Sequence, residues 1–246
     1  MANTVIFACA CPACRETQLV PAADIHKPIA PLCHCPTRET VDFEFGPDDW
    51  DRCTEPRLLR DCLGILCLPS SRRQLRLLGV ALGHLVYDWC KNYWFREAID
   101  AGEELADDKN TKRDLAGIRN TLEPYIFSRP YGKTDWVPVG LVCIADEPAF
   151  PPDGLDGNLK PNIAQAYREL FPNPFLSLAW KPEWLTSTAR ELAAHIYDAR
   201  DFAAMPVLAD ALQDAGCDDE QVLNHCRANK PHARGCWVVD AILGKS

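Results

Sequence analysis

Apolar residues recur at helical spacing through most of the chain after residue 55. The segment "RRQLRLLGVALGHLVYDWCKNYW" follows the cap-like "PSS" at 69–71 and is apolar over more than half of its circumference. This pattern predicts a central, buried helix. Other amphipathic helices are predicted in "EPRLLRDCLGILCL", "FREAIDAGEELADD", "TKRDLAGIRNTLEPYIF", "NIAQAYREL", "TSTARELAAHIYDAR", "DFAAMPVLADALQDAG" and "DDEQVLNHCRAN".

Two further apolar runs, one in the middle of the chain and one at its carboxyl end, predict two different elements. The run "VGLVCIA" lies in a segment rich in Pro, Gly and Asp and predicts a short buried strand within a linker. The final apolar run predicts a helix over 233–243, entered through Pro231 and ended by Gly244.

The first forty-six residues have a different pattern. Short β-prone runs at 4–7, 18–21 and 40–45 alternate with two cysteine clusters, and "RET" follows each cluster. We therefore predict a mainly α fold, in which a multi-helical body follows a small β-rich, zinc-ribbon-like amino-terminal module. The predicted domains are the cysteine module at 1–46, a helical domain at 47–130, a Pro/Gly-rich linker at 131–160 and a helical module at 161–246.

Composition limits the compartment and the partners. The chain has 246 residues, a formal net charge of −9 and thirteen cysteines. Its start lacks the charged and apolar regions of a secretory signal, and no apolar stretch approaches the length of a membrane span. An odd number of cysteines then points to thiols in a reducing cytoplasm, where clustered cysteines indicate metal rather than disulfides.

The amino-terminal cysteines predict a structural zinc site. Cys11 and Cys14 form a CxxC pair, and Cys33 and Cys35 follow at ribbon-type spacing. The second pair is CxC rather than CxxC, so Cys9 and His34 remain alternative ligands. Loosely packed free thiols and a redox pair are the competing interpretations.

The balance of charge disfavours nucleic acid as the partner of this module. Acidic residues outnumber basic ones within 1–46, whereas a nucleic-acid reader needs a basic surface. Another protein is the expected partner. Nucleic acid stays open as an alternative, because five arginines gather near one helix junction: Arg57, Arg60, Arg72, Arg73 and Arg76.

The stretch "HCRANKPHARGCWVVDAILG" allows three interpretations. A second metal site could draw on Cys217, His225, Cys226, His232 and Cys236. A catalytic set could use His232, Cys236 and Asp240, which share one face if 232–243 is helical. The third interpretation is structural and is favoured, with Asp240 paired to Arg234 or His232 in a buried setting.

The carboxyl-terminal segments resemble a helical module found in many uncharacterised proteins of planctomycete bacteria. The resemblance rests on "NPF", "PEWLTSTARELAAHIYDARDF", "MPVLADALQDAGCDDEQVLNHCR" and "HARGCWVVDAILGK", and the middle helices resemble the module that often precedes it. In that family an Arg usually follows "NPF", where this chain has Leu176. The resemblance implies an all-helical fold and no established activity.

The favoured hypothesis is therefore a non-enzymatic interaction or adaptor protein with a structural zinc. The alternative is a nucleic-acid-associated accessory protein or an enzyme that uses His232, Cys236 and Asp240.

Overall fold

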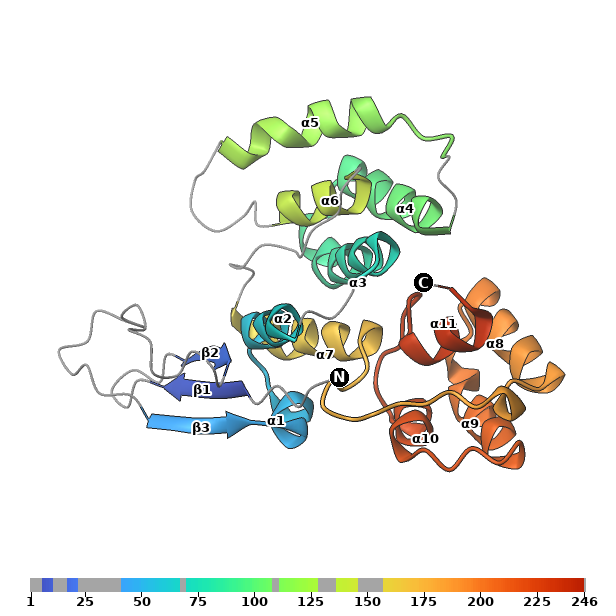
Figure 1. The fold of residues 1–246 in the computed structure, drawn as a ribbon. Coiled ribbons are helices and arrows are strands. Elements are labelled where there is room, and N and C mark those ends of the chain that lie inside the picture. Colours follow the sequence, from blue (N-terminus) through green and yellow to red (C-terminus); the bar gives the residue numbers. More distant parts are fainter. Residues whose placement is uncertain are drawn as a thin grey trace.

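The structure is a computed structural model that describes residues 6–10, 17–21, 41–66, 70–107, 111–127, 136–145 and 157–245. Helices make up most of these residues, which confirms the mainly α fold class (Figure 1). None of the described helices combines the length and the apolar character needed to cross a bilayer. The helices are α1 (Pro47–Arg52), α2 (Pro56–Ile65), α3 (Arg72–Cys90), α4 (Tyr93–Asp107), α5 (Leu115–Phe127), α6 (Trp136–Ile144), α7 (Lys160–Leu170), α8 (Ser187–Ala199), α9 (Met205–Asp214), α10 (Glu220–Arg227) and α11 (Trp237–Leu243), with short 3₁₀ turns η2 (Gly157–Leu159), η3 (Pro182–Trp184) and η4 (Phe202–Ala204).

A small antiparallel sheet stands at the amino-terminal end. Its strands β1 (Ile6–Ala10), β2 (Thr17–Pro21) and β3 (Val41–Phe45) take the order β2-β1-β3 and overlap the three β-prone runs. The predicted zinc ligands Cys11, Cys14, Cys33 and Cys35, and the alternative His34, lie outside the described residues. Cys9 belongs to β1, but its side chain is also outside what the structure describes, so the amino-terminal zinc site stays a prediction.

Helix α3 is the central helix, as its pattern predicts. Ser71 caps it by accepting a hydrogen bond from the backbone N–H of Gln74, while the Gln74 side chain accepts one from the N–H of Ser71. The helix then packs against α4, α6 and α7. Its leucines supply much of the surrounding core.

The run "VGLVCIA" is helical, so the prediction of a strand was wrong. Most of it belongs to α6, which packs against α3 and α4. A short apolar run shows no clear period, and burial on all sides suits a strand or a buried helix equally. Gly102 of α4 permits close packing, because a Cβ there would lie 2.8 Å from the Cβ of Cys143 in α6.

Two hydrophobic cores divide the described chain. The first contains residues from the sheet through α7, with Phe175 packed at its edge, and the second begins at Leu178 and contains α8 to α11. Helix α7 packs on α2 and α3, so the packing groups it with the first core rather than with the predicted module at 161–246. Figure 1 shows the second group of helices beside α7, on the side away from the sheet.

The last helix begins later than its pattern predicts. Helix α11 starts at Trp237, with Cys236 as its N-cap residue, so residues 232–236 lie outside it. Gly235 has a φ of 93°, a left-handed conformation that a continuous α-helix cannot contain. His232, Cys236 and Asp240 therefore do not share one helix face.

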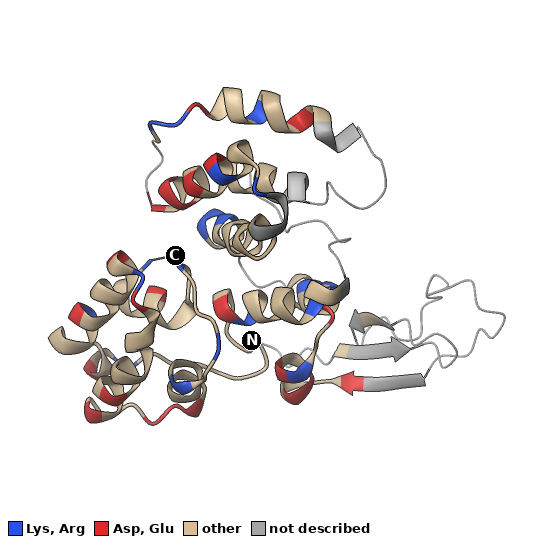
Figure 2. Cartoon of the chain, turned by 180° about the vertical axis from the view of Figure 1, so that it is seen from behind, with Lys and Arg blue, Asp and Glu red and all other residues tan. Residues whose placement is uncertain are grey.

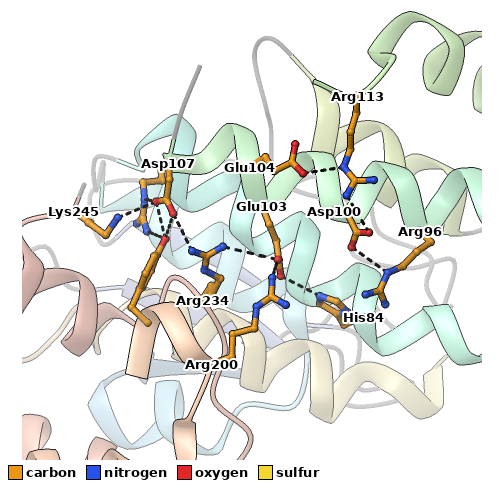
Figure 3. Close-up of polar contacts among 12 residues, drawn as sticks. His84, Arg96, Asp100, Glu103, Glu104, Asp107, Arg113, Arg200, Arg234 and Lys245 are labelled. Carbon is orange, nitrogen blue, oxygen red and sulfur yellow. Dashed lines mark hydrogen bonds and ion pairs between the residues drawn. The ribbon is translucent and has the colours of Figure 1, made fainter. Parts of the chain in front are cut away.

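A buried ionic network joins the two cores. Arg73 of α3 forms a bidentate pair with Asp240 of α11, and its Nη2 donates to the Tyr197 hydroxyl at 2.8 Å. The predicted partner of Asp240, Arg234 or His232, was wrong, because the sequence separation of 167 residues hid Arg73. Asp107 extends the network by accepting from Tyr197, Arg234 and Lys245 (Figure 3).

Candidate metal centre

Four side chains capable of binding a metal meet at the junction of the two cores. One ligand atom from each of Glu169, His225, His232 and Cys236 lies within 4.8 Å of all the others. Glu169 comes from the end of α7 in the first core, and His225 comes from the last turn of α10. His232 and Cys236 come from the connection that leads into α11.

Local structure explains why His232 and Cys236 reach the same point. The backbone N–H of Cys236 donates to the carbonyl of Ala233 at 3.0 Å, which closes a tight turn. Gly235 supplies the left-handed residue of that turn. A Cβ on Gly235 would lie 3.0 Å from Cδ1 of Leu77, so the turn also rests directly on α3.

The spacing of the ligand atoms suits a tetrahedral ion. Zinc holds nitrogen, oxygen and sulfur ligands at about 2.0–2.3 Å, which separates tetrahedral ligand atoms by roughly 3.3–3.8 Å. His225 Nε2 lies 3.2 Å from Cys236 Sγ and 3.4 Å from Glu169 Oε2. His232 Nδ1 lies 3.1 Å from the same Glu169 Oε2. These three separations are close to the edges of a slightly contracted tetrahedron, and all four ligand atoms lie within 4.8 Å of one another.

Burial controls the protonation of the four groups. Burial raises the pKa of the Cys236 thiol well above its usual range, so the thiol is protonated at neutral pH when no ion is bound. Burial also acts to raise the pKa of Glu169, but hydrogen bonds from His225 and His232 outweigh it and hold that pKa at about 2. Glu169 is therefore a buried anion whose charge its neighbours stabilise.

The same residues also form a hydrogen-bonded group without a metal, in which His232 Nε2 has no partner among the described residues. Trp237 Nε1–H donates to His225 Nδ1 at 3.0 Å, which leaves the ring proton on Nε2, facing Glu169 and Cys236. A metal at Nε2 would displace that proton. The neutral ring would then carry its proton on Nδ1, where two donors, Nδ1–H and the Trp237 indole N–H, would face each other. Metal binding must therefore shift the Trp237 side chain relative to His225.

The cluster contains three of the five residues proposed from sequence for the second metal site. Cys217 and Cys226 lie outside it and are buried in the second core. Burial raises the pKa of Cys226 to about 12, as expected of a thiol packed among apolar side chains. Asp240, the third member of the alternative catalytic set, is bound to Arg73.

Sequence reasoning missed Glu169. It lies in "YRELF" on an amphipathic helix, where a carboxylate ordinarily faces solvent. Here it is 2% exposed and accepts from both histidines. Glu169 lies more than fifty residues before His225 in the sequence. A short, regular spacing such as that of a CxxC pair therefore does not link the two residues.

Other cysteine and histidine side chains of the described helices lie outside the cluster. Cys62 is fully buried in the first core, and Cys53 is half-buried. His84 is exposed, and its Nε2 lies 3.3 Å from Glu103 Oε1.

Comparison of the chain with known protein families, with curated proteins and with solved structures found no match. The fold and the cluster therefore have to support any functional conclusion on their own, and the likeness to a planctomycete family stays a prediction.

Proposed function

We propose that the protein is a non-enzymatic, zinc-binding interaction protein in which zinc fastens the carboxyl-terminal helices to the helical body. The observation that carries this proposal is the meeting of Glu169, from the first core, with His225, His232 and Cys236, from the second. A metal bound by all four would act as a cross-link between the cores, in addition to the Arg73–Asp240 pair.

A structural role for this zinc follows from the number of ligands. Structural zinc sites use four protein ligands, whereas catalytic sites keep one position for water or substrate. The four side chains are also buried or nearly so. A nucleophilic role for Cys236 has little support, because burial keeps its pKa high and Asp240 is paired with Arg73 instead of with His232.

A protein partner suits the charge of the chain better than nucleic acid. The net charge is −9, and Lys and Arg lie among Asp and Glu along the described helices (Figure 2), whereas a nucleic-acid reader needs a basic surface. At the arginine-rich junction, Arg73 is bound to Asp240 and Arg76 donates to the carbonyls of Leu105 and Ala145. These two guanidinium groups bind acceptors within the protein, so they are not available to bind the phosphates of a nucleic acid.

Metal content of the purified, reduced protein tests this proposal. Because the amino-terminal cysteines are a second predicted site, the informative quantity is the loss of one zinc equivalent on substitution. Cys236→Ser and Glu169→Gln should each lower the zinc content by about one equivalent. Cys226→Ala removes a buried cysteine outside the cluster and should leave the zinc content unchanged.

Limited chymotrypsin digestion measures the cross-link independently. Leu176 is exposed in the connection between the two cores and is followed by Ser177, so the bond after it can be cleaved. Cleavage there should be faster in Cys236→Ser than in Cys226→Ala. If the zinc content of Cys236→Ser equals that of the unsubstituted protein, the proposed site does not exist.

A further inference from the structure

A cavity of about 400 Å³ lies at the junction of the two cores. Cavities of this size at the interface between domains are the usual places for small-molecule ligands. The cavity lies between α3 and α7 on one side and the segments around η4 and Pro231 on the other. Its apolar wall comes from Val80, Ala81, Leu85, Ala166, Phe202 and Pro231.

Buried nitrogen atoms without partners belong to residues that line this cavity. Gln165 Nε2, His232 Nε2 and Arg234 Nε are buried, and none has a hydrogen-bond partner among the described residues. A buried donor left unsatisfied costs about 1–3 kcal/mol, so native structures supply it with a protein group, water or a ligand. Gln165 Nε2 and Arg234 Nε are both hydrogen-bond donors, so each needs an acceptor atom such as an oxygen.

The charges around the cavity favour an anionic acceptor. Arg200 and Arg234 both reach Glu103 of α4, where they converge from the second core (Figure 3). Two guanidinium groups thus share this carboxylate, although Asp107 also accepts from Arg234 at 3.2 Å. The other carboxylate on the wall, Glu169, is 2% exposed, and hydrogen bonds from His225 and His232 stabilise its charge.

We propose that this cavity binds a small amphipathic carboxylate. The apolar body of the ligand lies against Val80, Leu85 and Phe202, and its carboxylate accepts from Gln165 and from the arginine pair. The site does not require the proposed zinc, because neither Gln165 nor Arg234 is a metal ligand. If zinc binds His232 Nδ1, the proton on Nε2 adds a further donor to the lining residues.

Titration calorimetry with octanoate tests the site, and octanamide serves as the uncharged probe of the same length. Octanoate should bind with submillimolar affinity, and octanamide should bind about tenfold more weakly, since it lacks the charge that the arginines recognise. Equal affinities for the two probes would overturn the carboxylate assignment. Absence of octanoate binding would overturn the site.

Two pairs of variants locate the binding. Arg200→Gln should weaken octanoate binding about tenfold, whereas Arg227→Gln, at an ion pair outside the cavity, should not. Ala81→Phe fills the apolar end and should abolish binding, whereas Ala211→Phe on α9 should retain it. Circular dichroism confirms that each variant is folded, and an unchanged octanoate affinity in Ala81→Phe would contradict the proposal.

Zinc content separates this proposal from the previous one. The cavity variants should bind as much zinc as the unsubstituted protein, because the metal ligands are retained. A cavity variant that loses octanoate binding but keeps its zinc supports the cavity proposal independently of the metal centre. If the unsubstituted protein binds octanoate but contains no zinc, only the metal centre is refuted.

Discussion

The substitution Asp240→Ala removes one partner of the buried ion pair that joins the two cores. Asp240 is 5% exposed and Arg73 is 9% exposed. The Arg73 guanidinium makes a bidentate contact with the Asp240 carboxylate. Alanine would leave the Arg73 guanidinium buried without its carboxylate partner. Water cannot fully replace that carboxylate, because little water reaches so buried a position.

The size of the effect follows from what remains around Arg73. Breaking a buried ion pair by removing one partner costs about 3–5 kcal/mol. Asp107 stays 3.3 Å from Arg73 Nε and compensates in part. We therefore expect Asp240→Ala to lower the free energy of unfolding by about 3 kcal/mol, at the lower end of the range.

Urea unfolding at pH 7, followed by circular dichroism, measures this change. Asp210→Ala is the matched control, because Asp210 also pairs with an arginine on a neighbouring helix but is 70% exposed. Its cost should stay below about 1 kcal/mol. The double variant Arg73→Met, Asp240→Leu should regain most of the loss, since it buries no unpaired charge. Equal costs for the two aspartate variants would refute this account of the junction.

Three further predictions concern the same region. Gly235→Ala should lower the free energy of unfolding by about 2–3 kcal/mol in thermal unfolding, because it adds a Cβ 3.0 Å from Leu77 to a residue at φ 93°. Gly244→Ala, at φ 65° with nothing within 4 Å, should cost only about 1 kcal/mol, and equal costs would argue against the contact with Leu77. Burial and the Asp107 carboxylate raise the pKa of Tyr197 from 10.0 to about 12. The unfolded chain therefore loses this proton at a lower pH than the folded protein does. As a result, the free energy of unfolding should fall by about 2–3 kcal/mol as the pH rises between these two pKa values. Tyr197→Phe should lack that part of the alkaline loss in a pH series of urea titrations, and an unchanged slope would show that Tyr197 is not its source. Cys236 should resist iodoacetamide in the native protein at pH 7, because it is buried and its sulfur is either protonated or bound to zinc. Rapid modification detected by mass spectrometry would restore the nucleophile hypothesis.

The helical body could be predicted from sequence because its signals are local. Ser71 with Gln74 forms a capping box, and Thr186 and Asp219 cap α8 and α10 through their side chains. These signals need only neighbouring residues, so they specify helices wherever the apolar period agrees. The α6 segment shows no clear helical period, and the strand prediction failed there.

The candidate metal centre could be predicted only in part, because its residues meet through tertiary packing. His225, His232 and Cys236 lie within twelve positions, and their chemistry drew attention to them. The proposed helix over 233–243 placed Asp240 with them, and Gly235 breaks that helix. Glu169 and Arg73 come from other helices, and no local pattern indicates which carboxylate or guanidinium will be buried.

X-ray absorption at the zinc edge shows directly whether Glu169, His225, His232 and Cys236 hold a zinc ion. The sample is the protein with Cys9, Cys11, Cys14, Cys33 and Cys35 replaced by serine, which removes the predicted amino-terminal cysteine ligands. We expect one equivalent of zinc, with one sulfur at about 2.3 Å and three nitrogen or oxygen ligands at about 2.0 Å. A sample that holds no zinc, or zinc bound by several sulfurs, would contradict the proposed centre of Glu169, His225, His232 and Cys236.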